Sequence, residues 1–110
     1  MDQGAAEVNL EFTDKADADL GEIWVYNADR YSVEHADKYR AFLLVELETL
    51  REQPEWGKTV ENFPNLRCLV MRWRAGGYGH AAYYEIHSDA VRIVRILHTA
   101  MDAPGHIDAQ

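Results

Sequence analysis

The stretch Val91-Arg92-Ile93-Val94-Arg95-Ile96-Leu97-His98 lies close to the end of the chain, and the predicted fold depends on it. It belongs to a strand-like run over Ala90–His98, and successive side chains of a strand point to opposite faces. On that alternation, one face carries Val91, Ile93 and Leu97, and the other carries Val94 and Ile96. A strand that is apolar on both faces needs cover on both sides.

A helical hairpin earlier in the chain can cover only one face of a sheet that contains this strand. The other face has two candidate coverings. A partner protein is the first, because a large exposed apolar surface usually marks an interaction site. The C-terminal tail, with Met101, Pro104 and Ile107, is the second. The two coverings are compatible with each other.

The first half of the chain predicts one strand and two helices. Residues 8–12 alternate apolar and polar side chains, which indicates a half-buried strand. Thr13 and Ser32 are predicted helix N-caps. Apolar or small side chains follow each cap at helical spacing: Ala16, Leu20, Ile23, Trp24, Asn27 and Tyr31, then Ala36, Tyr39, Leu43, Leu47 and Leu50. The junction is short, so we expect an antiparallel helical hairpin.

The second half predicts a loop and three strands. Pro54 and Gly57 should end the second helix, and residues 55–65 read as a loop. Strands are then expected over residues 67–74, 80–87 and 90–98, with a glycine-rich turn at 76–79. The predicted fold class is therefore α+β: a strand, a helical hairpin and a three-stranded antiparallel meander, with the helices on one face of the sheet.

The size of the chain and its single cysteine narrow the class of protein. Its 110 residues predict one domain over 1–110, with an ordered core over about 8–102 and a tail over 103–110. No apolar run is long enough to cross a bilayer, and the N-terminus lacks the pattern of a secretion signal. Cys68 cannot form a disulfide within the chain. We therefore expect a cytoplasmic protein without membrane contact.

Charge is distributed unevenly along the chain. The net charge is −8, which argues against sequence-specific binding of nucleic acid by this chain alone. Most of the acidic residues precede residue 64, whereas the last strands carry five arginines: Arg67, Arg72, Arg74, Arg92 and Arg95. These arginines are either a solvated face, paired with the acidic helices, or a surface that recognises an acidic protein segment. An anionic partner should therefore meet the second half.

No catalytic residue, metal site or cofactor is predicted. On a strand, His80 points away from the face that carries Glu85 and His87, so these groups do not converge on a metal. Cys68 has no evident activating neighbour, and we expect it to be a small buried residue. The glycines at 76–79 lead into a strand rather than a helix, so they form a turn and not a phosphate-binding loop.

Several segments, taken together, resemble one known family. The segment Asp19-Leu20-Gly21-Glu22-Ile23-Trp24-Val25-Tyr26 resembles the opening "DLxxIWxY" helix of ParE proteins. The turn Pro54-Glu55-Trp56-Gly57 and the later Leu66-Arg67 are similar to their "P-x-x-G" turn and "LR" strand start. Tyr83-Tyr84-Glu85-Ile86 and the closing strand quoted above resemble their "fYrv" and "VxIxRVLH" strands. The resemblance covers most of residues 8–102.

The resemblance implies a toxin of the ParE/RelE toxin–antitoxin superfamily. Such a toxin would be neutralised by a ParD-like antitoxin and would act on DNA gyrase without being an enzyme. The alternatives are a RelE-type nuclease that cleaves messenger RNA on the ribosome, or a relative that binds an antitoxin and poisons nothing. The segment Thr99-Ala100-Met101-Asp102 after the last strand has no basic residue, which favours the gyrase branch over the nuclease.

Two sets of residues are predicted to bind partners. The set for the antitoxin comprises Trp24, Tyr39, Arg72, Arg74, Tyr83, Arg92, Val94, Arg95 and Ile96. Within it, Trp24 is expected mainly to pack in the core, and Arg95 has the alternative of facing the helices. The set for the cellular target, which follows from the family resemblance, comprises His98, Met101, Asp102 and His106.

Overall fold

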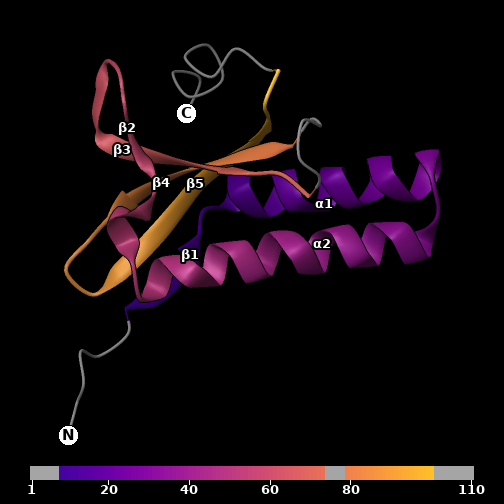
Figure 1. Cartoon of the computed structure of the whole chain (residues 1–110), viewed down its shortest axis with the longest axis horizontal. Coiled ribbons are helices and arrows are strands. Elements are labelled where there is room, and N and C mark those ends of the chain that lie inside the picture. The colour runs from indigo at the N-terminus through magenta and orange to yellow at the C-terminus, as the bar shows by residue number, and fades with distance from the viewer. Residues whose placement is uncertain (1–7, 74–78, 101–110) are drawn as a thin grey trace, which may run out of the picture.

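The computed structural model describes residues 8–73 and 79–100. Two helices and five strands make up the framework, with two short 3-10 turns between them (Figure 1). In chain order they are β1 (Asn9–Phe12), α1 (Asp14–Arg30), α2 (Val33–Glu48), η1 (Thr49–Arg51), η2 (Pro54–Trp56), β2 (Lys58–Val60), β3 (Phe63–Met71), β4 (His80–Ile86) and β5 (Ala90–His98).

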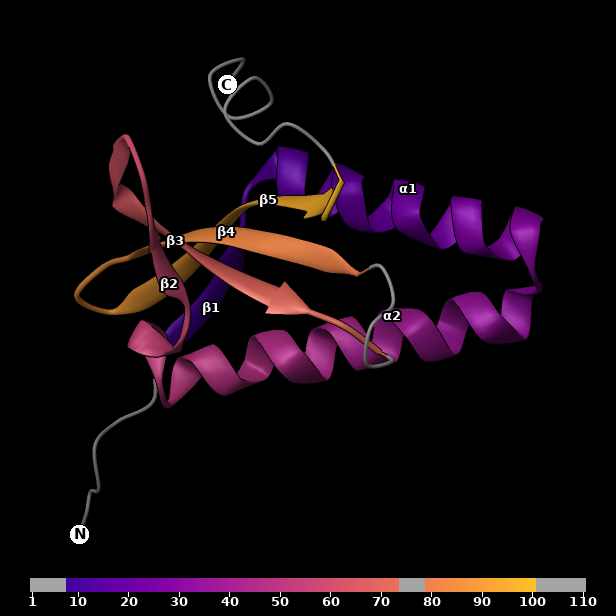
Figure 2. The same ribbon diagram turned by 45° about the horizontal axis from the view of Figure 1, so that its top comes forward.

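The helices form an antiparallel hairpin along one side of the sheet, and the turn between them lies well beyond the strands (Figures 1 and 2). The strand order is β1-β5-β4-β3-β2. The β1–β5 pair is parallel, and the other three pairs are antiparallel. The predicted α+β class, with its helices on one face, is therefore confirmed. The last described strand, β5, lies inside the sheet between β1 and β4.

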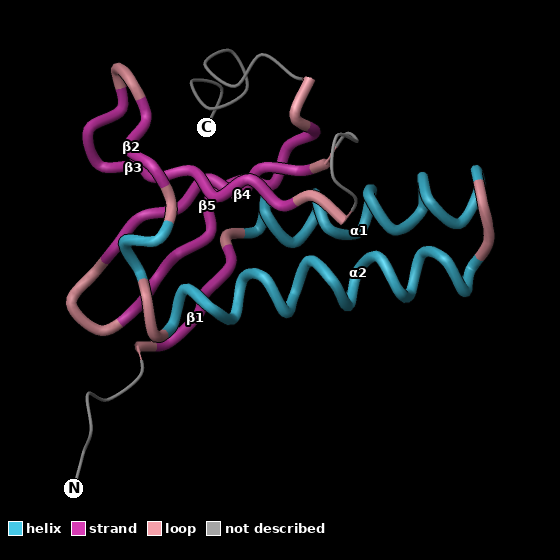
Figure 3. The backbone as a smooth tube through the Cα atoms, in the orientation of Figure 1, coloured by secondary structure: helices cyan, strands magenta, loops and turns pink. Residues whose placement is uncertain are grey.

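The predicted loop over residues 55–65 is wrong, because it contains the turn η2 and the strand β2 (Figure 3). Strand β2 has only three residues, too few to show an alternating pattern in the sequence. It pairs with β3 through a tight turn in which Asn62 adopts a φ of 71°, a conformation that asparagine tolerates. Strand β3 consequently begins at Phe63 and ends at Met71, earlier than predicted at both ends.

The predicted helix caps are confirmed. The hydroxyl of Thr13 accepts a hydrogen bond from the backbone N–H of Ala16, and the hydroxyl of Ser32 accepts one from that of His35. The apolar stripe predicted for α2 is buried throughout. The prediction that Tyr31 lies on the buried face of α1 is wrong, since it follows the end of that helix and is 60% exposed.

A β-bulge in β5 changes which of its side chains face the helices. Tyr83 pairs with Arg95, whereas the next residue, Tyr84, pairs with Ile93, so Val94 is an extra residue in β5. The extra residue reverses the alternation of the residues after it. Ile96 therefore joins the helix-side core, and Leu97 lies on the opposite face, which corrects the predicted faces of both.

Beyond the end of β1, side chains at the start of α1 form hydrogen bonds with the backbone edge of β5. The hydroxyl of Thr13 donates to the carbonyl of Val94. Further along the helix, Oδ2 of Asp19 accepts from the backbone N–H of Ile96 at 2.8 Å. The same carboxylate binds Arg95 through two bonds, of 2.8 and 2.9 Å. The side chains of Arg95 and Asp19 are only 15% and 10% exposed. The Asp19 carboxylate therefore satisfies both a backbone N–H at the edge of β5 and a largely buried positive charge.

We expect the Asp19→Ala substitution to destabilise the fold by about 3 kcal/mol, since it leaves a nearly buried guanidinium and a strand N–H without their acceptor. Urea unfolding followed by circular dichroism measures this. Glu11→Ala is the matched control, because it removes a carboxylate from the exposed pair with Arg92 and should change stability by less than about 1 kcal/mol. Equal losses in the two variants would contradict a special role for Asp19.

Candidate partner-binding surfaces

The sheet face opposite the helices is the first candidate surface. Strand register assigns its side chains, because residues paired across strands share a face. Cys68, Tyr83 and Arg95 form one row, and Val70, Ala81 and Leu97 form the next. Tyr83 is half-buried and Val70 is 44% exposed. Ala81 and Leu97 are buried on this face.

Cys68 and Tyr83 interact with each other on this open face. Burial raises the pKa of the Cys68 thiol, and it raises the pKa of Tyr83 to about 12. Both groups are therefore neutral near pH 7. Cys68 is half-buried rather than fully buried, which corrects the prediction for it, and its raised pKa makes it a poor nucleophile.

The arginines predicted for antitoxin binding do not form one cluster. Arg92 is exposed and lies 3.4 Å from Glu11 of β1. Arg72 is exposed just after β3, and Arg74 lies outside the described residues. Strand register places Arg95 in the row with Tyr83, but its guanidinium is bound by Asp19 of α1, so the alternative that it contacts the helices is confirmed. The side chains of Arg95 and Ile96 are both largely buried, which disfavours the predicted contact of either with an antitoxin.

The second candidate surface is a group of rings between α2 and the end of β3, which we name the aromatic cluster. Trp73 is its centre, with ring centroids 5.4 Å from His35, 5.4 Å from Tyr39 and 5.9 Å from Phe42. Tyr31 extends the cluster toward the hairpin turn and lies 4.5 Å from His35. Trp73 is 40% exposed and Tyr31 is 60% exposed, so a partner can reach both rings.

Sequence reasoning included Tyr39 but missed the other members of the cluster. Trp73 lies next to the predicted Arg72 and Arg74, but only the folded chain brings it against α2. The available signal was the three-residue and four-residue spacing of His35, Tyr39 and Phe42 along one face of α2, with Tyr31 four residues before His35.

Tyr39 links the cluster to two histidines on the helix side of the sheet. Its hydroxyl lies 2.6 Å from Nδ1 of His80. His98 pairs with His80 across β4 and β5, with ring centroids 5.4 Å apart. Burial, and then the neighbouring His98, lower the pKa of His80 to about 4. The pKa of Tyr39 is raised to about 12 by burial.

Trp24 supports the helical hairpin without entering the core. Its indole N–H donates to Asp37 of α2 at 2.9 Å, and the ring is half-buried. The prediction that it packs in the core is therefore wrong. Beside it, large apolar side chains at the far end of the hairpin are more than half exposed: Val25, Tyr26 and Val33. We name these three residues, with Tyr31, the hairpin tip.

Other kinds of site find no support in the described part of the chain. Residues 8–73 and 79–100 contain no group of three or more His, Cys, Asp or Glu side chains that could hold a metal ion. Among these residues, no helix is long and apolar enough to cross a membrane. Val94, the bulge residue, is half-buried. Three of the four residues predicted to meet the target, Met101, Asp102 and His106, lie outside the described residues.

Comparison with known proteins decides the family. The sequence model described as "ParE toxin of type II toxin-antitoxin system, parDE" matches residues 10–103. The chain belongs to the ParE toxin family. It is 36% identical over 93 residues to "Toxin ParE1" of Caulobacter vibrioides, and the match covers 84% of this chain and 91% of that protein.

Three solved structures share the fold of this ParE-family chain. A chain of the chromosomal ParDE system of P. aeruginosa matches with a TM-score of 0.71 at 22% identity, covering 84% of this chain and 96% of that one. A mutant of the E. coli toxin RelE in the free state matches at 0.64 and 13%, with coverages of 94% and 93%. The RelBE2 complex of Mycobacterium tuberculosis matches at 0.59 and 19%, with coverages of 84% and 99%.

The lowered pKa of His80 predicts a specific dependence of stability on pH. Unfolding returns the imidazole to a pKa near 6.5, so between pH 6.5 and about 4 the unfolded chain binds the extra proton. Stability should therefore fall with pH in that window, and the His80→Gln variant should lack this contribution. Urea titrations at pH 7 and 4.5 measure the free energy of unfolding of wild type and variant. The difference between the two proteins should be smaller at pH 4.5 than at pH 7 by about 1–2 kcal/mol. Parallel pH profiles would contradict the assignment.

Proposed function

We propose that this ParE-family chain is the toxin of a type II toxin–antitoxin system and is neutralised by a ParD-like antitoxin. The antitoxin would cover the aromatic cluster and the hairpin tip, and would extend toward Tyr83 and Arg92 on the open sheet face. The observation that carries this proposal is the exposure of Trp73 and Tyr31 beside α2. The antitoxin complexes among the related structures agree with a partner of this kind.

The chemistry of the cluster suits a protein partner. Tryptophan and tyrosine contribute strongly to protein interfaces, because their large rings bury much apolar area and lose little conformational freedom. Trp73 is already oriented by its contacts with Tyr39 and Phe42. Half-exposed rings in fixed positions, next to the apolar hairpin tip, would receive the apolar face of an amphipathic segment.

We expect the double substitution Tyr31→Ala and Trp73→Ala to weaken antitoxin binding by at least about thirtyfold, the effect of losing two aromatic anchors. Isothermal titration calorimetry with the purified antitoxin encoded beside the toxin gene measures the affinity. Val45→Ala on α2 is the control, since Val45 is 64% exposed and lies outside the cluster and the hairpin tip. Unchanged affinity in a double variant that still shows the wild-type circular dichroism spectrum would remove the cluster from the interface.

We propose further that the toxin acts by binding its target and is not an enzyme. General acid–base catalysis is most effective when the catalytic group titrates near the working pH. The pKa of His80 is lowered to about 4 and that of Tyr39 is raised to about 12, so neither group exchanges protons readily at pH 7. The net charge of −8 also disfavours an RNA substrate. DNA gyrase is the proposed target, on the strength of the family alone.

Two assays run in parallel test this target. The purified chain is added to gyrase and relaxed plasmid, and separately to ribosomes translating a defined messenger RNA. We expect lost supercoiling or trapped cleaved DNA, with the messenger intact. Cut messenger with unaffected gyrase would replace the proposal by a RelE-type nuclease, and His80→Gln would then be the first variant to examine. Inactivity in both assays would contradict gyrase as the target.

A further inference from the structure

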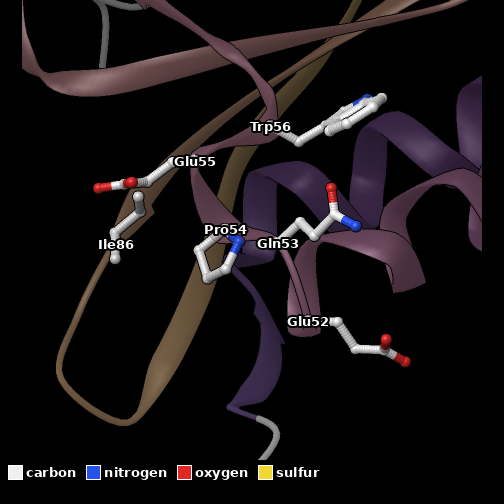
Figure 4. A pocket seen from close by; sticks show the side chains of 6 residues that line it. All are labelled: Glu52, Gln53, Pro54, Glu55, Trp56 and Ile86. Carbon is white, nitrogen blue, oxygen red and sulfur yellow. The ribbon is translucent and has the colours of Figure 1, made fainter. Parts of the chain in front are cut away.

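A shallow pocket lies at the end of β4 away from His80 and the aromatic cluster (Figure 4). It has a volume of about 480 Å³ and is lined by the turn η2, its approach and one strand residue: Glu52, Gln53, Pro54, Glu55, Trp56 and Ile86. Trp56 is 65% exposed and Ile86 is 41% exposed. An exposed indole and an exposed aliphatic side chain that line the same pocket offer the kind of contact area that protein partners use.

The floor of this pocket is held firmly by the sheet. The hydroxyl of Tyr84 donates to the carbonyl of Pro54 at 2.7 Å and accepts from the backbone N–H of Gly57 at 2.8 Å. The guanidinium of Arg67 donates to the carbonyl of Gly57 at 2.8 Å. A side chain at position 57 would meet the Tyr84 hydroxyl at 2.6 Å, so only glycine permits this close contact. A partner would therefore meet Trp56 on a backbone that is already ordered, which reduces the entropy lost on binding.

The charge of the pocket identifies the chemistry of its occupant. Glu52 and Glu55 contribute two carboxylates, and the other four lining residues are uncharged. In residues 8–73 and 79–100 neither carboxylate makes an ion pair. The adjacent Arg51 is engaged by Glu48 and by the carbonyl of Val8, and Arg67 is turned toward backbone carbonyls. The pocket thus attracts cationic groups and repels nucleic acid.

The geometry points to a short basic segment of a partner protein as the occupant, and we propose that this pocket is a docking site for it. Figure 4 shows Glu55 and Ile86 on one side of Pro54, with Trp56 and Gln53 on the other. A segment crossing Pro54 would place one cationic side chain by Glu55 and a second over the indole, while an apolar residue between them contacts Ile86 and Pro54. A guanidinium stacks well on tryptophan, so arginine is the favoured cation.

This site is separate from the aromatic cluster, so it goes beyond antitoxin neutralisation. The strand β4 runs from His80, beside the cluster, to Ile86, beside the pocket. A toxin must engage both an antitoxin and a target, and two surfaces at opposite ends of one strand allow the two partners different contacts. A test of the docking site can therefore contradict that proposal without contradicting the proposed antitoxin surface, and the reverse also holds.

The test is a titration of the full ¹⁵N-labelled chain with the synthetic peptide acetyl-GRLRG-amide, observed by NMR. The indole N–H signal of Trp56, assigned by its loss in Trp56→Phe, should shift as the peptide binds, and acetyl-GELEG-amide should not shift it. The double variant Glu52→Gln and Glu55→Gln should bind the arginine peptide about tenfold more weakly, because it loses the exposed ion pair at Glu55 and the attraction of the nearby Glu52 carboxylate.

The matched control is the double variant Glu34→Gln and Glu61→Gln, which makes the same change in net charge at two exposed carboxylates elsewhere. Its affinity should stay within about twofold of wild type. A loss at Glu52 and Glu55 at least about threefold greater than in the control supports the site. Similar losses in the two variants, or a Trp56 signal that does not move, would overturn it and leave only general attraction to an acidic chain.

Discussion

The carboxylate of Asp19 joins the helical layer to the sheet at the point where the first strand stops. Strand β1 pairs with β5 only as far as Ile93, and beyond it the edge of β5 would lack a partner. Asp19 accepts the N–H of Ile96 and neutralises Arg95, while Thr13 binds the carbonyl of Val94. An unpaired backbone edge and a buried charge are each unfavourable. Here the Asp19 carboxylate binds both the backbone N–H at the edge and the buried guanidinium. The position of α1, and through it that of the whole hairpin, follows from this contact.

The placement of the hairpin in turn creates the surfaces that a partner can reach. Because α1 is fixed along the edge of β5, the far halves of both helices extend past the sheet (Figure 2). Their apolar side chains near the turn find no strand beneath them, which leaves Tyr26, Tyr31 and Val33 exposed. Trp73 follows β3 out of the sheet and packs on α2 instead. The exposed rings are therefore a consequence of how the two layers are offset.

Much of the fold could be predicted from the sequence because its signals are local. The caps at Thr13 and Ser32 and the stripe on α2 depend only on neighbouring residues, and the structure confirms them. The bulge at Val94 could not be predicted, because one additional residue in a strand of apolar side chains leaves no local mark. The Asp19–Arg95 pair joins residues 76 positions apart, and nothing in either segment specifies the other. The burial of Ile96 and of Arg95 therefore could not be predicted from the sequence.

The position of β5 also has a consequence for synthesis of the protein. Strand β5 lies inside the sheet but is the last of the described strands to be made, and its contact with Thr13 spans 81 positions of the chain. While the nascent chain is still on the ribosome, α1 and α2 are available but the strand that anchors them is absent. Contacts of such long sequence separation form late, since the loop between them must close first. A growing or truncated chain thus lacks the strand that joins the helical hairpin to the rest of the sheet, so the complete fold forms only after translation has passed residue 98.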